Sequence, residues 1–237
     1  MALVFNVANS SYVAPISKQL TSNWICIGAV APELPNNLVG FVQSFEIKAH
    51  LAARQPSRAL DLIRRAWGWY LNNSAGTAST CIEGYLADGT FGYRATTGYA
   101  NDYSYTSHAH GWGTGPTDAL TSYVVGLTLV QPAGSQWLLS PQFGDLTFAE
   151  GGFTTSLGQF QASWTLENGG YSLDWSTPEG TTGTVVLSVP PNTAGQAPKV
   201  VLDGGTDAKM QADGWSPSAR TLTIQGAGGK HCAKVTY

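Results

Sequence analysis

The sequence FQASWTLENGGYSLDW at residues 160–175 decides the fold of the second half of this chain. Apolar residues alternate with polar ones on both sides of a Glu-Asn-Gly-Gly step. A period of two residues is typical of a β-strand with one buried face, and an Asn-Gly pair favours a hairpin turn. The stretch therefore predicts two antiparallel strands. On the first, one face carries Phe160, Ala162, Trp164 and Leu166, and on the second the pattern repeats with Tyr171, Leu173 and Trp175.

The strand pattern extends outward from this hairpin. Strand-like runs recur as KVVLDG at 199–204, RTLTIQG at 220–226 and HCAKVTY at 231–237. Several short strands with turn residues between them are typical of a β-sandwich. We therefore expect an antiparallel β-sandwich domain over residues 131–237, with its boundary near QPAGSQW at 131–137.

Residues 1–130 follow a helical pattern instead. Helices are predicted within 34–55, over 56–73 from a Pro-Ser start, and from Pro116 to about residue 130. The first two would form an αα-hairpin. In the first helix the predicted buried stripe is Leu38, Phe41, Val42, Phe45, Ala49 and Ala52, and the predicted polar face is Gln43, Glu46 and His50. The fold class is thus α+β in two parts.

The composition excludes several classes of protein. Charged residues make up 11% of the 237 residues and the net charge is −3, with no basic cluster that could bind nucleic acid. No apolar run is long enough for a membrane helix, and no signal peptide is visible, so the localisation stays open. Cys26, Cys81 and Cys232 have no metal-type spacing, and either one disulfide or three buried thiols is compatible with them.

A long loop at residues 73–116 collects the side chains that could carry chemistry. Long loops inside compact domains are often functional, and carboxylates, histidines and aromatic rings suit sugar binding. The loop and its end supply Cys81, Glu83, Tyr85, Asp88, Tyr93, Arg94, Asp102, Tyr103, Tyr105, His108, His110, Trp112 and Asp118.

Three kinds of site compete for this loop. His108 and His110 could share one face of a strand and bind a metal, but no third ligand has a recognisable spacing. Cys81 and a histidine could form a nucleophilic pair, without a local signature. Glycoside hydrolysis needs two carboxylates, and Glu83 in STCIEGY could be one of them or could simply cap a turn.

Four segments together resemble a known family. RALDLIRRAWGWYLNN at 58–73, STCIEGY at 79–85, SHAHGWGTGPTDALTSYVVGL at 107–127 and PQFGDLTFAEGGFTTSLGQFQASW at 141–164 resemble the C-terminal part of fungal and bacterial α-L-rhamnosidases of glycoside hydrolase family 78. The resemblance runs from about residue 20 to residue 190. It implies the last helices of an (α/α)6 six-hairpin barrel followed by a β-sandwich, and hydrolysis of terminal α-L-rhamnosides with inversion.

The resemblance also implies roles for individual residues. Glu83 matches the general base that activates water, and His110 matches a histidine that contacts the sugar. Trp112 matches a nearby aromatic, and Tyr85 and His108 are neighbours in the substrate-binding region. No cofactor or metal is implied, and the expected ligands are rhamnose-containing glycosides or polysaccharides.

The chain departs from the family pattern in its general acid, whose acidic motif has no counterpart in this sequence. Asp88, Asp102 or Asp118 are the candidates for a substitute. We therefore expect a truncated enzyme that is weak or inactive alone and that associates with another chain through exposed barrel helices. The alternatives are a non-catalytic carbohydrate-binding or structural β-sandwich, with sugars stacked on Trp137, Trp164 or Trp175, and a six-hairpin glycosidase for another sugar.

Overall fold

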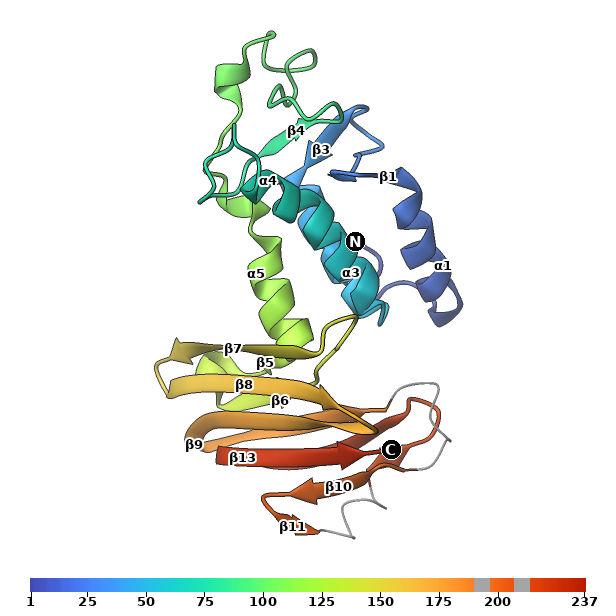
Figure 1. Cartoon of the computed structure of the whole chain (residues 1–237), viewed down its shortest axis with the longest axis vertical. Coiled ribbons are helices and arrows are strands. Elements are labelled where there is room, and N and C mark those ends of the chain that lie inside the picture. The colour runs from blue at the N-terminus through green and yellow to red at the C-terminus, as the bar shows by residue number, and fades with distance from the viewer. Residues whose placement is uncertain (190–196, 207–213) are drawn as a thin grey trace. The chain divides into compact units, whose positions relative to one another are not determined.

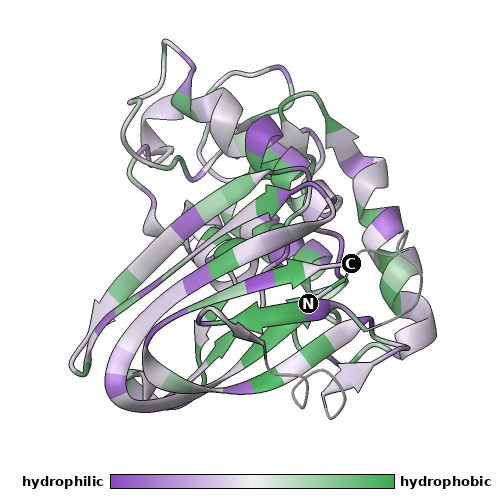
Figure 2. Cartoon of the chain, turned by 60° about the horizontal axis from the view of Figure 1, so that its bottom comes forward, coloured by the Kyte–Doolittle hydropathy of each residue, from purple (hydrophilic) through white to green (hydrophobic). Residues whose placement is uncertain are grey.

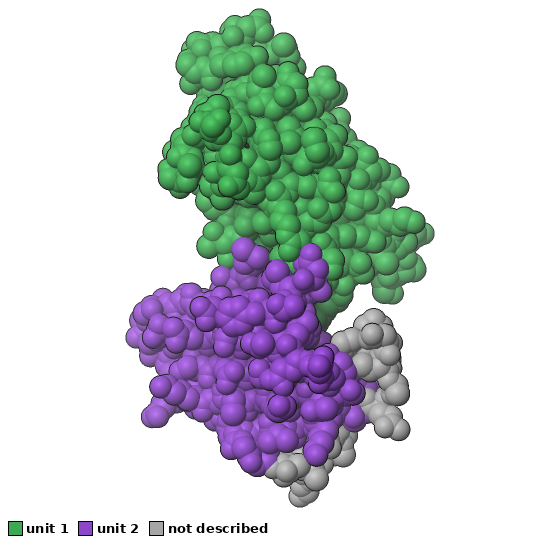
Figure 3. Space-filling model, in the orientation of Figure 1, with its two compact units in different colours: residues 1–119 green, residues 120–237 purple. Residues whose placement is uncertain are grey.

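The computed structural model describes residues 1–189, 197–206 and 214–237. The chain forms two compact units, Met1–Ala119 and Leu120–Tyr237 (Figure 3). Helices dominate the first unit and a sheet dominates the second (Figure 1). The predicted α+β class is confirmed at this level.

The first unit contains helices, short turns of helix and two small β-pairs. Its elements are α1 (Ser10–Leu20), η1 (Thr21–Asn23), β1 (Trp24–Ile25), β2 (Gly28–Ala29), β3 (Asn37–Val39), α2 (Gly40–Ala52), α3 (Pro56–Ile63), η2 (Arg64–Gly68), α4 (Trp69–Leu71), β4 (Gly84–Leu86), η3 (Tyr103–Tyr105), η4 (Gly111–Gly113) and α5 (Gly115–Ala119). Strand β1 pairs with β2, and β3 pairs with β4, both antiparallel.

The predicted faces of helix α2 are wrong in part, although Ala49 is buried as expected. Gln43 and His50, expected on the polar face, are buried, whereas Phe41 and Val42 are 38% and 41% exposed. One polar atom of each of these two buried side chains has a hydrogen-bond partner from another element. The amide of Ala29 donates to Gln43 Oε1 at 2.9 Å. His50 Nδ1 lies 2.8 Å from the hydroxyl of Ser17 on α1.

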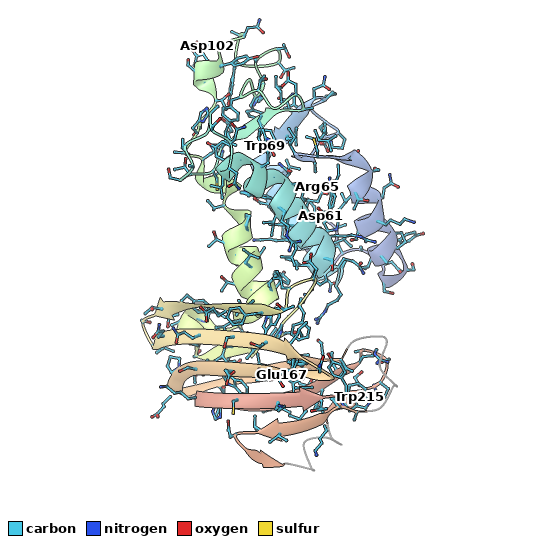
Figure 4. All side chains as sticks on the ribbon, in the orientation of Figure 1. Asp61, Arg65, Trp69, Asp102, Glu167 and Trp215 are labelled. Carbon is cyan, nitrogen blue, oxygen red and sulfur yellow. The ribbon has the colours of Figure 1, made fainter. Side chains whose placement is uncertain are left out.

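The second predicted helix is confirmed as the continuous segment α3–η2–α4. Pro56 occupies its first turn, as the sequence predicts. Asp61 and Arg65, one turn apart, form an ion pair of 2.9 Å (Figure 4). The wide π-turn of η2 shifts the register of the residues that follow. Tyr70 therefore takes the buried position, and Leu71 is 43% exposed.

No (α/α)6 barrel closes within the described part of the first unit. Its longer helices are α1, α2 and the segment that begins with α3, and its remaining elements are short. The prediction of barrel helices is therefore not supported by the fold of this chain alone. The predicted helix from Pro116 is present as α5 and η5, but it ends at Val125 because Gly126 adopts a φ of 89°.

The described residues of the second unit form one sheet of nine strands. Its elements are η5 (Leu120–Val125), β5 (Leu127–Leu129), η6 (Pro132–Gly134), β6 (Gln136–Leu139), β7 (Phe148–Thr155), β8 (Gly158–Glu167), β9 (Gly170–Ser188), β10 (Lys199–Leu202), β11 (Gly205–Thr206), β12 (Trp215–Ser216) and β13 (Thr221–Thr236). The predicted hairpin is confirmed as β8 and β9, with Gly169 at a φ of 76° in its turn.

Two long strands, β9 and β13, run the whole length of the sheet. The first part of β9 pairs with β8 and its last part pairs with β6, while β13 follows β9 from end to end. The ladder has a bulge between Ala227 and Gly229. The prediction of a purely antiparallel domain is wrong at one place, because β6 and β9 are parallel. The two runs 220–226 and 231–237 also belong to the single strand β13.

The predicted alternation along the strands is confirmed, and the structure shows that the apolar face is the buried one. Hydrophobic and hydrophilic residues alternate along the long strands in Figure 2. Trp137, Phe160, Trp164 and Tyr171 are among the largest fully buried side chains.

Glycines make room for one of these rings. A Cβ on Gly183 would lie 2.2 Å from the indole of Trp137, and one on its Cα partner Gly226 would lie 2.7 Å from the same ring. The ring therefore packs against strands that carry no side chain at these two positions.

Candidate functional site

Two segments of the long loop lie side by side and bring the predicted site residues together. The amide of His110 donates to the carbonyl of Cys81 at 2.8 Å, and the amide of Glu83 donates to the carbonyl of Ser107 at 2.8 Å. The start of α2 joins them, because the amide of Gly40 donates to the carbonyl of Glu83 at 3.1 Å. The backbone thus places Glu83 next to the turn that carries His110.

The carboxylate of Glu83 is oriented by two donors. The hydroxyl of Tyr99 donates to Oε1 at 2.8 Å, and the amide of Ser107 donates to Oε2 at 3.2 Å. The side chain is half-buried. The hydrogen bond to Glu83 and then burial raise the pKa of Tyr99 above its ordinary value. Both donors fix the orientation of the carboxylate next to the turn that carries His110.

Aromatic rings and one cation surround Tyr99. Its ring lies 6.0 Å from that of Tyr93 and 5.7 Å from that of Tyr105, centroid to centroid. The guanidinium of Arg94 lies 5.5 Å above the same ring. Burial and the charge of Glu83 raise the pKa of Tyr93. Tyr99 is therefore held in place on several sides while it donates to Glu83.

Trp112 is the most exposed aromatic of the predicted site. It is 69% exposed, and its ring lies 5.1 Å from that of Phe41. Together with Phe45, Lys48 and other residues these two rings line a hollow of about 230 Å³. An exposed indole beside a hollow is a suitable surface for the apolar face of a sugar ring.

The turn that carries Trp112 is held in place by contacts with buried residues. The indole Nε1 of Trp67 donates to the carbonyl of Gly113 at 2.6 Å, and Trp67 is buried. Gly113 also packs closely on the loop backbone, because a Cβ there would lie 3.1 Å from the carbonyl oxygen of Ile82. The core of the unit therefore sets the position of the turn.

The two histidines have different surroundings. The ring of His108 packs edge-on against Phe91 at 5.1 Å, and its Nδ1 lies 3.4 Å from the hydroxyl of Tyr70. His110 is half-buried, and within the described residues no protein hydrogen bond ties its ring nitrogens. His110 thus has ring nitrogens available to a ligand, whereas His108 is engaged in packing.

Tyr85 lies in the core rather than at a surface. It is 2% exposed, and its hydroxyl donates to the carbonyl of Ile27 at 2.6 Å. Its ring lies 4.5 Å from that of Trp69, labelled in Figure 4. Burial raises the pKa of Tyr85, against a smaller lowering by its hydrogen bond with Gln43. In this structure Tyr85 supports the loop from within.

The three candidate substitutes for a general acid are engaged elsewhere. Hydrogen bonds from Thr90 lower the pKa of Asp88, and hydrogen bonds from Ser104 lower that of Asp102. Asp102 lies at the tip of the loop in Figure 4. Asp118 forms an ion pair of 2.6 Å with Lys48. A general acid needs a raised pKa, whereas the surroundings of Asp88 and Asp102 lower the pKa of each carboxyl.

Other predictions concern metals, thiols and membranes. Among the described residues no group of three or more His, Cys, Asp or Glu side chains could hold a metal ion. All three cysteines are free thiols, but Cys26 and Cys232 are exposed, so the prediction of buried thiols is wrong for these two. No helix in the described ranges is long and apolar enough to cross a membrane.

The sandwich tryptophans cannot form the sugar-stacking surface that one alternative requires. Trp137, Trp164 and Trp175 are 1%, 1% and 4% exposed, respectively. Alternation alone could not tell the buried face from the exposed one. Conversely, the loop analysis missed Tyr99 and Ser107, since no local pattern indicates that they donate to Glu83.

Comparison with known proteins bears on both units. Residues 126–202 match the family model of the bacterial alpha-L-rhamnosidase C-terminal domain. The predicted resemblance to α-L-rhamnosidases is therefore confirmed, and the matched residues lie in the second unit. No curated protein matches the sequence.

Two solved structures share the fold. An α-L-rhamnosidase from Dictyoglumus thermophilum is similar over 100% of this chain and 24% of its own, with a TM-score of 0.71 and 15% identity. One from Streptomyces avermitilis, complexed with L-rhamnose, is similar over 94% of this chain and 24% of its own, with a TM-score of 0.57 and 15% identity. The chain thus spans about a quarter of the length of these proteins.

Proposed function

We propose that this chain is the C-terminal part of an α-L-rhamnosidase of glycoside hydrolase family 78, which hydrolyses terminal α-L-rhamnosides with inversion. In this proposal residues 1–130 are the last helices of an (α/α)6 six-hairpin barrel, and residues 131–237 are its C-terminal β-sandwich. The match over residues 126–202 and the similar solved structures support this assignment.

The arrangement of Glu83 carries the mechanistic part of the proposal. Its carboxylate is fixed by Tyr99 and Ser107, next to the turn of His110 and Trp112. In an inverting reaction an ionised carboxylate removes a proton from water as that water attacks the anomeric carbon. Glu83 is proposed as this general base.

The turn supplies the proposed sugar contacts. The ring nitrogens of His110 would hydrogen-bond sugar hydroxyls, and the exposed indole of Trp112 would cover one face of the ring. His108 and Tyr85 would support this site through packing, His108 against Phe91 and Tyr85 in the core. The proposal uses no cofactor or metal.

The reaction also needs a general acid that protonates the leaving oxygen. The proposal gives this role to none of Asp88, Asp102 and Asp118, because each is bound in a turn, a cap or an ion pair. We therefore expect weak or no hydrolysis by the chain alone.

Binding of L-rhamnose, followed by backbone amide shifts in NMR spectra, tests the site without requiring catalysis. We expect shifts at residues 81–85 and 107–113, together with a tenfold or greater loss of affinity for Trp112→Ala. Phe148→Ala, which removes an aromatic ring that is 50% exposed in the second unit, is a matched control. Rhamnose that perturbs neither segment would contradict the proposal. Strong hydrolysis of an aryl α-L-rhamnoside by the chain would contradict only the expected inactivity.

A further inference from the structure

A polar trough crosses one face of the sheet in the second unit. It has a volume of about 710 Å³ and lies over β7, β8, β9 and β13, which are neighbours in that order (Figure 1). The side chains that matter for its chemistry are Glu150, Gln161, Ser163, Asp174, Ser176 and Lys230.

The strand register explains why these side chains share a face. Gln161 is the Cα partner of Ser176, and Ser176 is the partner of Lys230. In the next row Glu150 pairs with Ser163, which pairs with Asp174. Directly opposite residues of a sheet project to the same side, so two polar rows run across the strands. Of the residues between these rows, Ala162 and Trp175 are buried in the core.

A glycine leaves one end of the trough without a side chain. Gly152 on β7 is opposite Gln161 and lines the trough without a side chain. A Cβ there would lie 2.2 Å from the carbonyl oxygen of Phe160, so the backbones of β7 and β8 approach closely at this point. At Gly152 the surface of the trough is therefore backbone, and we call the polar side chains named above its walls.

The polar groups of the walls are available to a ligand. Within residues 1–189, 197–206 and 214–237, no protein hydrogen bond or ion pair occupies the side chains of Glu150, Gln161, Asp174 or Lys230. The two carboxylates accept hydrogen bonds, the ammonium of Lys230 donates them, and the amide of Gln161 does both. A concave set of mixed donors and acceptors suits a ligand with many hydroxyl groups.

The charge of the trough and its extent across the strands narrow the chemical class of ligand further. Two carboxylates and one ammonium leave a net negative wall, which disfavours uronates and phosphates and favours a neutral sugar. Three strand spacings separate β7 from β13, or roughly 14 Å, which exceeds one pyranose ring. The most exposed large ring of the chain, Trp112, is not part of this surface, so binding would rest on hydrogen bonds and bridging water.

We propose that the second unit binds a short neutral oligosaccharide in this trough, at a site separate from Glu83. The choice of a rhamnose-containing sugar as the probe rests on the proposed function, whereas the site itself does not. The probe is rutinose, a neutral disaccharide of rhamnose and glucose, and trigalacturonate is the acidic comparison.

The test is a titration of the full isotope-labelled chain, followed by backbone amide shifts in NMR spectra. Rutinose is expected to shift the amides of Gly152, Gln161 and Lys230. Gln161→Ala and Asp174→Asn should each raise the dissociation constant for these shifts at least fivefold. Gln225→Ala, an exposed glutamine on β13 outside the trough, should leave it unchanged. Trigalacturonate should bind at least tenfold more weakly than rutinose.

Three outcomes would overturn the trough proposal: no shift at these amides, equal affinity of the trough variants and the parent chain, or equal binding of trigalacturonate. Thermal unfolding of each variant checks that the fold is intact. Failure of the proposed function looks different. Rutinose would then shift the trough amides but not residues 81–85 and 107–113, and Trp112→Ala would have no effect on any binding.

Discussion

Replacing Gly183 by alanine tests how the core of the second unit is packed. The new Cβ would lie 2.2 Å from Cδ2 of Trp137 and within 2.5 Å of two further ring atoms. Backbone strain does not enter, since the φ of Gly183 is outside the left-handed region. The indole must therefore move, or the strands β6 and β9 must separate.

The magnitude follows from two contributions. Overpacking of a filled core costs about 1–3 kcal/mol. A displaced indole also loses the 3.1 Å hydrogen bond from its Nε1 to the hydroxyl of Thr181, worth about 1 kcal/mol. We expect Gly183→Ala to lower the free energy of unfolding by about 2–4 kcal/mol. That is a large part of the stability of a domain of this size.

Urea unfolding followed by far-ultraviolet circular dichroism measures this loss. Gly205→Ala is the control, because its nearest atom would be the carbonyl oxygen of Leu202 at 3.6 Å, an ordinary contact. The substitution Trp137→Leu removes the ring that the new Cβ would contact. In that background the loss of unfolding free energy caused by Gly183→Ala should fall below about 1 kcal/mol. Equal costs for the two glycines, or an undiminished cost without the indole, would refute the reasoning.

Three further predictions follow from the hydrogen bonds of individual side chains. Tyr85→Phe leaves buried partners unpaired and should cost about 1–3 kcal/mol in urea unfolding, and an unchanged midpoint would contradict its core role. Glu83→Gln removes the charge that accepts from Tyr99, so the pKa of Tyr99, followed by NMR, should fall toward its ordinary value; no change would mean that the two groups are uncoupled. Asp203 accepts from His231 at 2.8 Å; although burial acts in the opposite direction, this bond and the Cys232 amide hold the pKa of Asp203 below its ordinary value. A lowered carboxyl pKa stabilises the fold above the unfolded-state pKa, and this is lost as the pH falls through the native one. Asp203→Asn should therefore be less stable than the parent chain near neutral pH and equally stable in strong acid; a constant difference at all pH values would exclude this linkage.

The sequence predicted the sheet better than the helices, for a physical reason. In β8 every second side chain enters the core, so the period of two residues identifies the strand and the residues that share a face. Helix α2 is instead buried on the side of Gln43 and His50, and hydropathy assigns such residues to solvent. Partners far along the chain, Ser17 and Ala29, make their burial possible, and no local pattern shows these contacts.

The candidate site divides in the same way. Glu83, His110 and Trp112 stand in short motifs, so sequence reasoning could propose them and the backbone pairing of their loops brings them together. Tyr99 lies 16 residues from Glu83 in an irregular segment, and its contact with that carboxylate depends on how the loop folds back. The direction of Tyr85, inward to the core, likewise depends on the pairing of β3 with β4.

The length of β9 and β13 has a consequence for how the second unit comes apart. Strand β9 pairs with β8 along its first part and with β6 along its last part, and β13 pairs with β9 along both parts. Neither part of the sheet can therefore detach unless the ladder between β9 and β13 breaks. Amides at both ends of these strands should therefore exchange slowly with solvent, with similar free energies of opening. A single cooperative unit of this kind resists fraying from one side, and a force applied to either end of β9 is carried through the whole domain.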